Sequence, residues 1–246
     1  MLELLDVIAS EVMKIKKNKM SWIGTTIVVL LPILLILKCL FIDRQRGEYF
    51  EWFQISFVVN MLALPIVSGF VITVIIQKEY QDNTLRNVLL APTSRTDFVI
   101  SKIVIWALWY VITLGLIEVV IGAGLYILYP QEFNLKNLGY TIYFLTEYGV
   151  FSFISMLPIL WVAFKQKHLF YPSMLITLGF TALELAGRQV NEEMLELASI
   201  CPWTAVSVSG MVEVKSIHFW ICAVSIFICG VVGILGSVST FKKQNL

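Results

Sequence analysis

Residues 77–102 read QKEYQDNTLRNVLLAPTSRTDFVISK and interrupt two long apolar runs with polar, mixed-charge sequence. A short helix is predicted inside this loop, because the capping residues Asp82 and Asn83 precede an apolar stripe at the i, i+3, i+4 spacing. The stripe consists of Leu85, Val88 and Leu89. Pro92 ends the helix, since the residue before a proline is pushed out of the α region. A helix between two membrane spans cannot bury such a stripe in the bilayer core, so the pattern predicts docking in a protein groove.

The composition indicates a polytopic membrane protein. Of the 246 residues, 58% are hydrophobic and 14% are charged, and the mean hydropathy is +0.83. Soluble domains average about 45–50% apolar and about 25% charged residues. The formal net charge of +1 gives no sign of a nucleic-acid partner, and we expect none.

Six apolar segments follow an amphipathic N-terminus, each close to the ~20 residues that cross a bilayer. They cover residues 22–41, 52–76, 103–129, 140–164, 169–185 and 219–241. Residues 1–20 place apolar side chains at steps of three or four between charges, which predicts an elbow helix lying along the inner membrane surface. We therefore expect an all-α membrane protein with an interfacial helix at 1–20 and a six-helix transmembrane domain at 21–246.

The distribution of Lys and Arg predicts that both termini are cytoplasmic. Twelve of the 18 fall in the N-terminal segment, the 77–102 loop, the fourth loop and the tail, and positive charge concentrates on the cytoplasmic side. The remaining connections are acidic, and we count Glu184 among their carboxylates. The longest, 186–218, has an apolar spacing that predicts short re-entrant helices. Cys39 and Cys201 both fall near this outer side, where free thiols and a disulfide are both possible.

The 77–102 loop also carries the spacing of a known family. Its motif residues are Glu79, Thr84, Leu85, Pro92, Ser94, Arg95 and Lys102. They resemble the E…T-L…P-x-S-R…K signature of the cytoplasmic loop between the second and third spans of ABC-2-type transporter permeases. The order of spans extends the resemblance to nearly the whole chain. Asn83 stands where many relatives have glycine. After glycine, asparagine is the residue that best tolerates a left-handed backbone.

The resemblance implies a six-helix fold of the ABC-2 exporter type, in which the loop holds a cytoplasmic coupling helix that docks on a separate ABC ATPase. It also implies two ATPase copies and a second permease subunit, identical or homologous, in the plasma membrane. The residues expected at the ATPase interface are Glu79, Asn83, Thr84, Leu85, Arg86, Val88, Leu89, Pro92 and Arg95. The chain lacks the G-x-x-x-x-G-K-[ST] phosphate loop. We therefore expect ATP and Mg to bind to the ATPase, and this chain to bind no cofactor directly and to be no enzyme.

Two carboxylates fall inside the expected spans, Glu118 and Glu147. Carboxylates in the membrane are costly and turn toward protein or a cavity. They either line a pathway for a cationic substrate or hold helices together through hydrogen bonds. The short outer loops and the Pro202-Trp203 pair resemble permeases that protect bacteria from lantibiotics, so the resemblance favours a cationic, amphiphilic antimicrobial peptide as substrate. No metal site is expected, because neither His168 nor His218 has a second ligand at a suitable spacing.

Two other classes of function stay open. One is a non-transporting scaffold or sensor, in which the same loop holds a signalling partner. The other is a proton-coupled carrier that uses Glu118 and Glu147. An ATPase partner supports the transporter, a kinase partner supports the sensor, and transport that follows a proton gradient without ATP supports the carrier.

Overall fold

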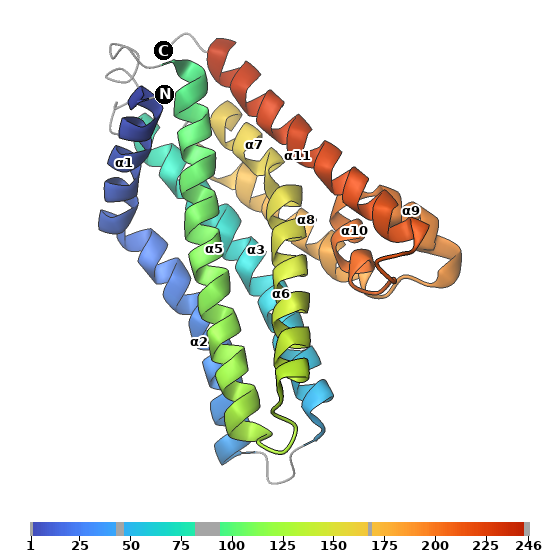
Figure 1. The fold of residues 1–246 in the computed structure, drawn as a ribbon. Helices are drawn as coiled ribbons and strands as arrows, with labels where there is room; N and C mark the ends of the chain where they lie inside the picture. Colours follow the sequence, from blue (N-terminus) through green and yellow to red (C-terminus); the bar gives the residue numbers. More distant parts are fainter. Residues whose placement is uncertain (1, 43–46, 82–93, 167–168, 244–246) are drawn as a thin grey trace.

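The computed structural model describes residues 2–42, 47–81, 94–166 and 169–243, and these residues form helices and short connections without strands (Figure 1). The elements are α1 (Leu2–Lys17), α2 (Lys19–Phe41), α3 (Tyr49–Gln81), α5 (Arg95–Leu128), α6 (Leu135–Met156), α7 (Pro158–Gln166), α8 (Tyr171–Gly187), η1 (Glu192–Met194), α9 (Leu195–Ile200), α10 (Pro202–Ser209) and α11 (Ile217–Lys243). The all-α expectation is confirmed. The short helix predicted after Asn83 lies outside the described residues.

Five of the described segments are long and apolar enough to cross a membrane. They are α2, α3, α5, the segment formed by α6 and α7, and α11. The fifth expected span, 169–185, corresponds to α8, which has 17 residues and is roughly 25 Å long at ~1.5 Å per residue. The hydrocarbon core of a bilayer is ~30 Å thick. At 17 residues, α8 is at the lower end of the range of about 17–25 residues that can cross a bilayer, so the fifth span stays a prediction.

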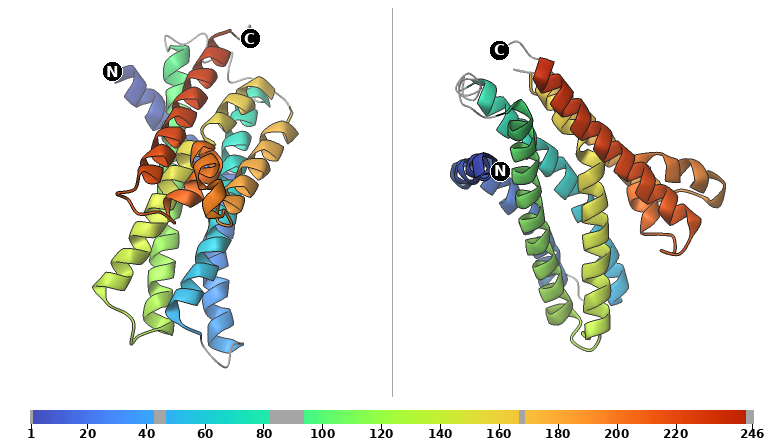
Figure 2. Two further views of the ribbon diagram at one scale, coloured as in Figure 1. Left: turned by 90° about the vertical axis from the view of Figure 1, so that its right-hand side faces the viewer. Right: turned by 45° about the horizontal axis from the view of Figure 1, so that its top comes forward.

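The two ends of the described chain lie at one end of the molecule, which we call the terminal end (Figure 1). Helices α2, α3, α5 and α6 reach the opposite end, the far end, where α5 leads into α6. Helices α8 and α11 diverge from this group, and η1, α9 and α10 between them lie well short of the far end (Figures 1 and 2). The connection 186–218 thus contains three short helical elements, and Cys201 separates α9 from α10. Cys201 is a free thiol and does not pair with Cys39.

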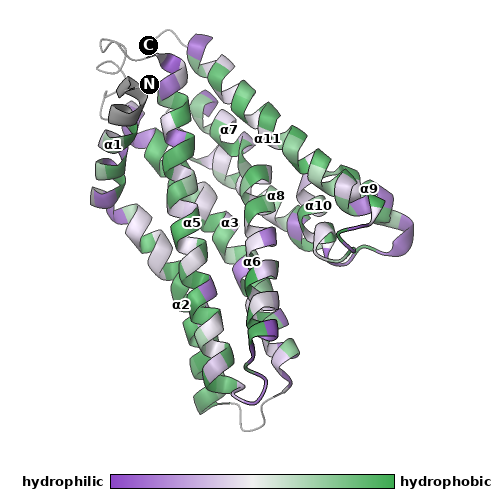
Figure 3. Ribbon diagram, in the orientation of Figure 1, coloured by the Kyte–Doolittle hydropathy of each residue, from purple (hydrophilic) through white to green (hydrophobic). Residues whose placement is uncertain are grey.

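Apolar residues, green in Figure 3, make up much of the long helices, and many of their side chains are exposed. Val119 of α5, Phe227 of α11 and Leu235 of α11 are 70%, 65% and 64% exposed. Soluble monomers rarely expose contiguous apolar surface on this scale. These faces suit contact with lipid or with another membrane subunit.

Small residues bring α11 and α8 close to their neighbours. A Cβ atom added to Gly233 of α11 would lie 2.6 Å from the backbone nitrogen of Pro158, where α6 gives way to α7. An added Cβ on Gly69 of α3 would clash with Thr177 of α8. Such small residues allow membrane helices to approach closely. They fix how α8 and α11 pack on the rest of the bundle, and so position the cavity described below.

Candidate functional site

Four charged side chains from three helices form a buried ion network at the terminal end. Lys102 of α5 is fully buried, and its Nζ lies 2.5 Å from Glu11 Oε2 and 2.6 Å from Glu79 Oε1. Lys14 lies at the rim, with its Nζ 2.7 Å from Glu11 Oε1 and 3.0 Å from Glu79 Oε1. The ion network (Glu11, Lys14, Glu79 and Lys102) therefore joins α1 to the end of α3 and the first turns of α5. Helices α3 and α5 lie on either side of residues 82–93 in the sequence.

The ion network balances two carboxylates with two ammonium groups, which matters because an unpaired buried charge costs on the order of several kcal/mol. Burial lowers the pKa of Lys14, but the hydrogen bond and charge of Glu11, followed by the charge of Glu79, outweigh burial and raise this pKa above its ordinary value of 10.5. A raised lysine pKa stabilises the fold at every pH below the unfolded value. That contribution is lost only as the pH rises through the raised pKa.

Two of the residues predicted at the ATPase interface are described, and both make contacts within the chain. Glu79 belongs to the ion network, so its carboxylate is turned into the bundle. Arg95 donates from Nη1 to the backbone carbonyls of Phe241 (3.3 Å) and Lys242 (2.8 Å), in the last turn of α11. The other predicted contacts lie outside the described residues, and their docking stays a prediction. They are Asn83, Thr84, Leu85, Arg86, Val88, Leu89 and Pro92.

Glu11 and Lys14 were not predicted from the sequence as members of this network. A signal was present, because Glu11 follows Ile8 by three positions and precedes Ile15 by four. It therefore lies on the apolar stripe of α1, where a carboxylate needs a buried partner. In the structure Glu11 is 4% exposed, whereas Met13 is 61% exposed. The orientation of α1 follows from this charge as well as from its apolar residues.

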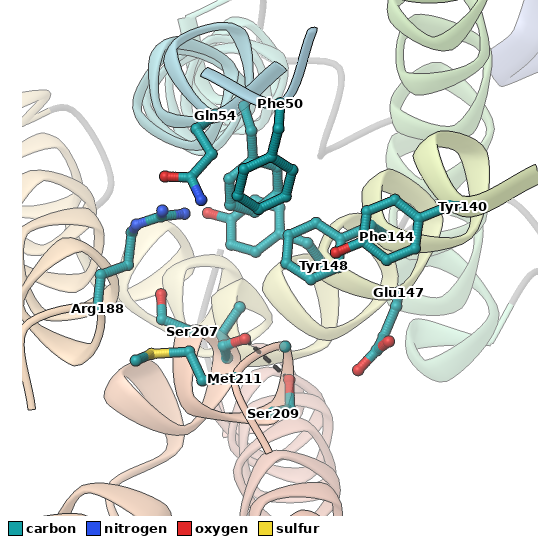
Figure 4. Close-up of a pocket in the computed structure, with 13 residues that line it drawn as sticks. Phe50, Gln54, Tyr140, Phe144, Glu147, Tyr148, Arg188, Ser207, Ser209 and Met211 are labelled. Atoms are coloured by element: carbon teal, nitrogen blue, oxygen red, sulfur yellow. Dashed lines mark hydrogen bonds between the residues drawn. The ribbon is translucent and has the colours of Figure 1, made fainter. Parts of the chain in front are cut away.

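A second candidate region is a cavity of about 230 Å³ between α3, α6 and α10 (Figure 4). It is lined by Phe50, Gln54, Phe57, Tyr140, Phe144, Glu147, Tyr148, Arg188, Val206, Ser207, Ser209, Gly210 and Met211. Figure 4 shows Glu147 and Arg188 on opposite sides of it. The Arg188 guanidinium lies 5.1 Å from the centre of the Phe57 ring, a cation–π contact, and burial lowers the pKa of Arg188 below its ordinary 12.5. The cavity therefore combines aromatic walls with one group of each charge.

The two carboxylates predicted on a substrate pathway have different surroundings. One oxygen of Glu147, Oε1, is buried without a hydrogen-bond partner among the described residues. Buried polar atoms are normally satisfied, so this oxygen lacks the partner that such atoms usually have, while the same carboxylate interacts with Tyr143. Glu118 of α5 accepts a hydrogen bond from Thr146 Oγ1 at 2.7 Å and does not line the cavity. The structure thus brings Glu147 to the cavity and uses Glu118 to join α5 to α6.

Glu184 is a correction to the sequence analysis, which counted it among the carboxylates of the outer connections. It lies on α8, fully buried, and accepts hydrogen bonds from Tyr148, Ser152 and Ser155 of α6. These three residues follow one another at i, i+4 and i+7, so one face of α6 carries three hydroxyl groups. The error came from placing Glu184 by its nearness to the end of a span. The hydroxyl spacing on α6 was the signal that could have located it.

The profile of the family described as ABC-2 family transporter protein matches residues 7–184. The match starts in α1, includes every member of the ion network and the α3 and α6 walls of the cavity, and ends at Glu184. The chain belongs to the ABC-2 transporter family. The ABC-2 family resemblance of the 77–102 loop is therefore confirmed, and the chain is a multi-pass membrane permease of an ABC transporter. ABC-2 permeases work with a partner ATPase in general. No curated protein matches the chain significantly.

Proposed function

We propose that this permease, together with two ATPase copies and a second permease subunit, removes a cationic, amphiphilic peptide of the lantibiotic kind from the plasma membrane. The terminal end faces the cytoplasm in this proposal, which puts the loop 77–102 within reach of the ATPase. The observation that carries the choice of substrate is the unpartnered, buried Oε1 of Glu147 in an aromatic cavity. An ammonium or guanidinium group would satisfy that oxygen, and aromatic rings also attract such cations.

The size of the cavity supports recognition of one side chain of the peptide. Sites for drug-sized ligands have volumes of about 300–1,000 Å³, and this cavity has about 230 Å³. A complete peptide does not fit, whereas a lysine or arginine side chain does. The rest of the peptide would stay against the apolar surface of the helices and in the membrane. A second permease subunit would supply the other half of the pathway.

The ion network supports the proposed route for the mechanical force. A push on the predicted helix between Thr84 and Leu90 would act on the end of α3 and the start of α5 together. Lys102 and Glu79 tie these two ends to Glu11 of α1. The three helices would therefore move as one unit, and α3 carries the movement to Phe57 in the wall of the cavity.

Co-purification of the ATPase tests the coupling half of the proposal. Replacing the apolar stripe with charges, in the double variant Leu85→Asp and Leu89→Asp, should abolish binding of the ATPase while membrane insertion is kept. Leu135→Asp is the matched control, because Leu135, the first residue of α6, is 89% exposed and this variant should not affect ATPase binding. Normal recovery of the ATPase with the double variant would contradict this assignment. Recovery of a kinase in place of an ATPase would favour the sensor.

Two isosteric variants test the substrate half. Glu147→Gln removes the charge in the cavity and should lower peptide resistance in cells that express the complete transporter, by about tenfold if roughly 1.4 kcal/mol of binding is lost. Glu118→Gln is the control, since the Glu118 carboxylate contacts Thr146 and lies outside the cavity. Equal killing curves for Glu147→Gln and the wild type would contradict a role for this cavity in recognising cations.

A further inference from the structure

Glu184 has a set of hydrogen-bond partners that is unusual for a buried carboxylate, because all of them are hydroxyl groups. Tyr148 Oη lies 2.6 Å from Glu184 Oε2, Ser152 Oγ lies 3.2 Å from both carboxylate oxygens, and Ser155 Oγ lies 3.1 Å from Oε1. Within the part of the chain that the structure describes, Glu184 makes no salt bridge. Its charge is balanced by hydrogen bonds alone.

Two of these hydroxyl groups have an alternative acceptor within reach. Tyr148 Oη lies 3.0 Å from the Met61 carbonyl oxygen of α3, and Ser155 Oγ lies 2.8 Å from the Ser152 carbonyl oxygen. Each hydroxyl has a single hydrogen to donate. The hydrogens of Tyr148 and Ser155 can therefore point either at the carboxylate or at a backbone carbonyl.

These alternatives give two complete hydrogen-bond patterns that differ by one proton. When Glu184 is ionised, Tyr148, Ser152 and Ser155 all donate to the carboxylate. When Glu184 is protonated, its O–H donates to Tyr148 Oη, Tyr148 donates to the Met61 carbonyl, and Ser155 donates to the Ser152 carbonyl. Ser152 donates to the carboxyl group in both patterns. In neither charge state is the hydroxyl of Tyr148, Ser152 or Ser155 left without a partner, although such an orphan would cost ~1–3 kcal/mol.

The groups around Glu184 favour a proton over a metal ion as the ligand. The hydroxyl oxygens already contact the carboxylate at 2.6–3.2 Å, which leaves no space between them for an ion with its own oxygen shell. The titratable and charged groups that face this cluster are Tyr148 of α6, Tyr110 of α5 and, one turn further along the chain from Glu184, Arg188. On the other sides, α3 contributes the Met61 carbonyl and α10 contributes Ser207, which donates to the Glu184 carbonyl.

Tyr148 connects this cluster to the cavity, because it both contacts Glu184 and lines the cavity with Glu147 and Arg188. We propose that Glu184 is a proton-binding site, and that a cation entering the cavity drives its proton out through Tyr148. On release, the Tyr148 hydrogen leaves the Met61 carbonyl and passes to solvent in the cavity while the Glu184 proton passes to the Tyr148 oxygen, so the tyrosine stays neutral. A positive charge in the cavity favours the ionised carboxylate, and by linkage a proton on Glu184 weakens binding of the cation. The displacement of the proton by a cation rests on the proposed function, whereas the proton site itself does not.

Infrared difference spectroscopy of the full-length permease in nanodiscs tests the proton site directly. A carboxyl C=O band should appear on acidification and disappear on raising the pH. Glu184→Gln should remove it, whereas the matched variants Glu147→Gln and Glu118→Gln should retain it. Tyr148→Phe, which keeps the ring, should shift the pH at which the band changes. A titrating band of unchanged intensity in Glu184→Gln, or no difference between the wild type and Glu184→Gln at any pH, would overturn the proposal.

A second measurement separates the proton site from the proposed substrate. A synthetic amphipathic peptide of leucine and lysine, added at a pH where the band is present, should reduce the band and release protons to a pH-sensitive dye. Neither effect should occur with Glu147→Gln. A band that titrates normally and does not change with the peptide would support the proton site and overturn its link to the cavity, whereas the killing curves of Glu147→Gln decide the proposed substrate independently.

Discussion

Lys102 shows how a lysine is held at zero exposure inside this bundle. Its ammonium group has carboxylate oxygens from two different helices at 2.5 and 2.6 Å, and it also lies 4.9 Å from the centre of the Phe98 ring. Lys14 touches the same two carboxylates from the rim, where 48% of its side chain is exposed. The two lysines thus differ in burial while sharing their partners, which makes them a matched pair.

Lys102→Met should destabilise the permease far more than Lys14→Met. Removing Lys102 takes the fully buried ammonium group of the network away from Glu11 and Glu79, and breaking a buried ion pair costs about 3–5 kcal/mol. Exposed pairs are worth ~0–1 kcal/mol, so Lys14→Met should have a small effect. Thermal unfolding in detergent, followed by loss of the monodisperse elution peak, measures the difference. Equal unfolding midpoints for the two variants would show that the network does not hold the three helices together.

At the scale of the helices, the contact of α11 with the junction of α6 and α7 depends on the absence of a side chain. Gly233 faces the backbone of Leu157 and Pro158, where the helix is already interrupted by a proline that cannot donate a hydrogen bond. Backbone atoms cannot rotate away as side chains do. A larger residue must therefore push the two helices apart.

Gly233→Ala should lower stability, and Gly179→Ala should not. A Cβ on Gly233 would lie 2.6 Å from the Pro158 nitrogen and 2.7 Å from the Leu157 carbonyl carbon, whereas one on Gly179 of α8 would meet nothing within 4 Å. Overpacking costs about 1–3 kcal/mol, while alanine in an exposed helix gains up to ~1 kcal/mol over glycine. Unfolding midpoints in the same detergent should therefore move in opposite directions. A shift of the same sign in both variants would indicate that helix propensity, not this contact, decides the outcome.

Hydropathy and charge predicted most of the helices, because a membrane span is defined by a local run of apolar residues. The same local reasoning found Glu147, a carboxylate in such a run. Hydropathy and charge alone did not place Glu11 or Glu184, because the position of each depends on which face its helix turns toward a neighbour. The Glu11 side chain is oriented by Lys102, 91 positions later, and that of Glu184 by hydroxyl groups on α6.

At the scale of the whole molecule, the two ends of the bundle differ in chemistry. The terminal end holds the ion network and the Arg95 contact with α11, while the cavity with Glu147 and Arg188 lies further along α3 and α6 (Figures 1 and 4). The family match covers the ion network and the α3 and α6 walls of the cavity in one stretch of chain and ends before Arg188. A single permease subunit therefore contains both the region on which the ATPase is proposed to push and the cavity that is proposed to contact the substrate.

Cysteine accessibility should establish which end faces the cytoplasm. In a variant without native cysteines, Lys136→Cys at the far end should react with a membrane-impermeant maleimide added to intact cells. Lys243→Cys at the terminal end should react only after the membrane is permeabilised. Both positions are exposed. A lack of reaction in intact cells would therefore mean that the membrane blocks the reagent, and not that the cysteine is buried. The reverse pattern would contradict cytoplasmic termini, and with them the proposed docking of an ATPase on the loop 77–102.

The two hydrogen bonds from Arg95 to the last turn of α11 span 146 and 147 positions of sequence. They fasten the tail of the chain to the first turn of α5, directly after the segment on which the ATPase is proposed to push. A fluorophore attached behind Lys243 would therefore travel with that segment. In an assembled transporter, the separation between two such dyes would follow the power stroke during each round of ATP hydrolysis, with no label disturbing the docking surface itself.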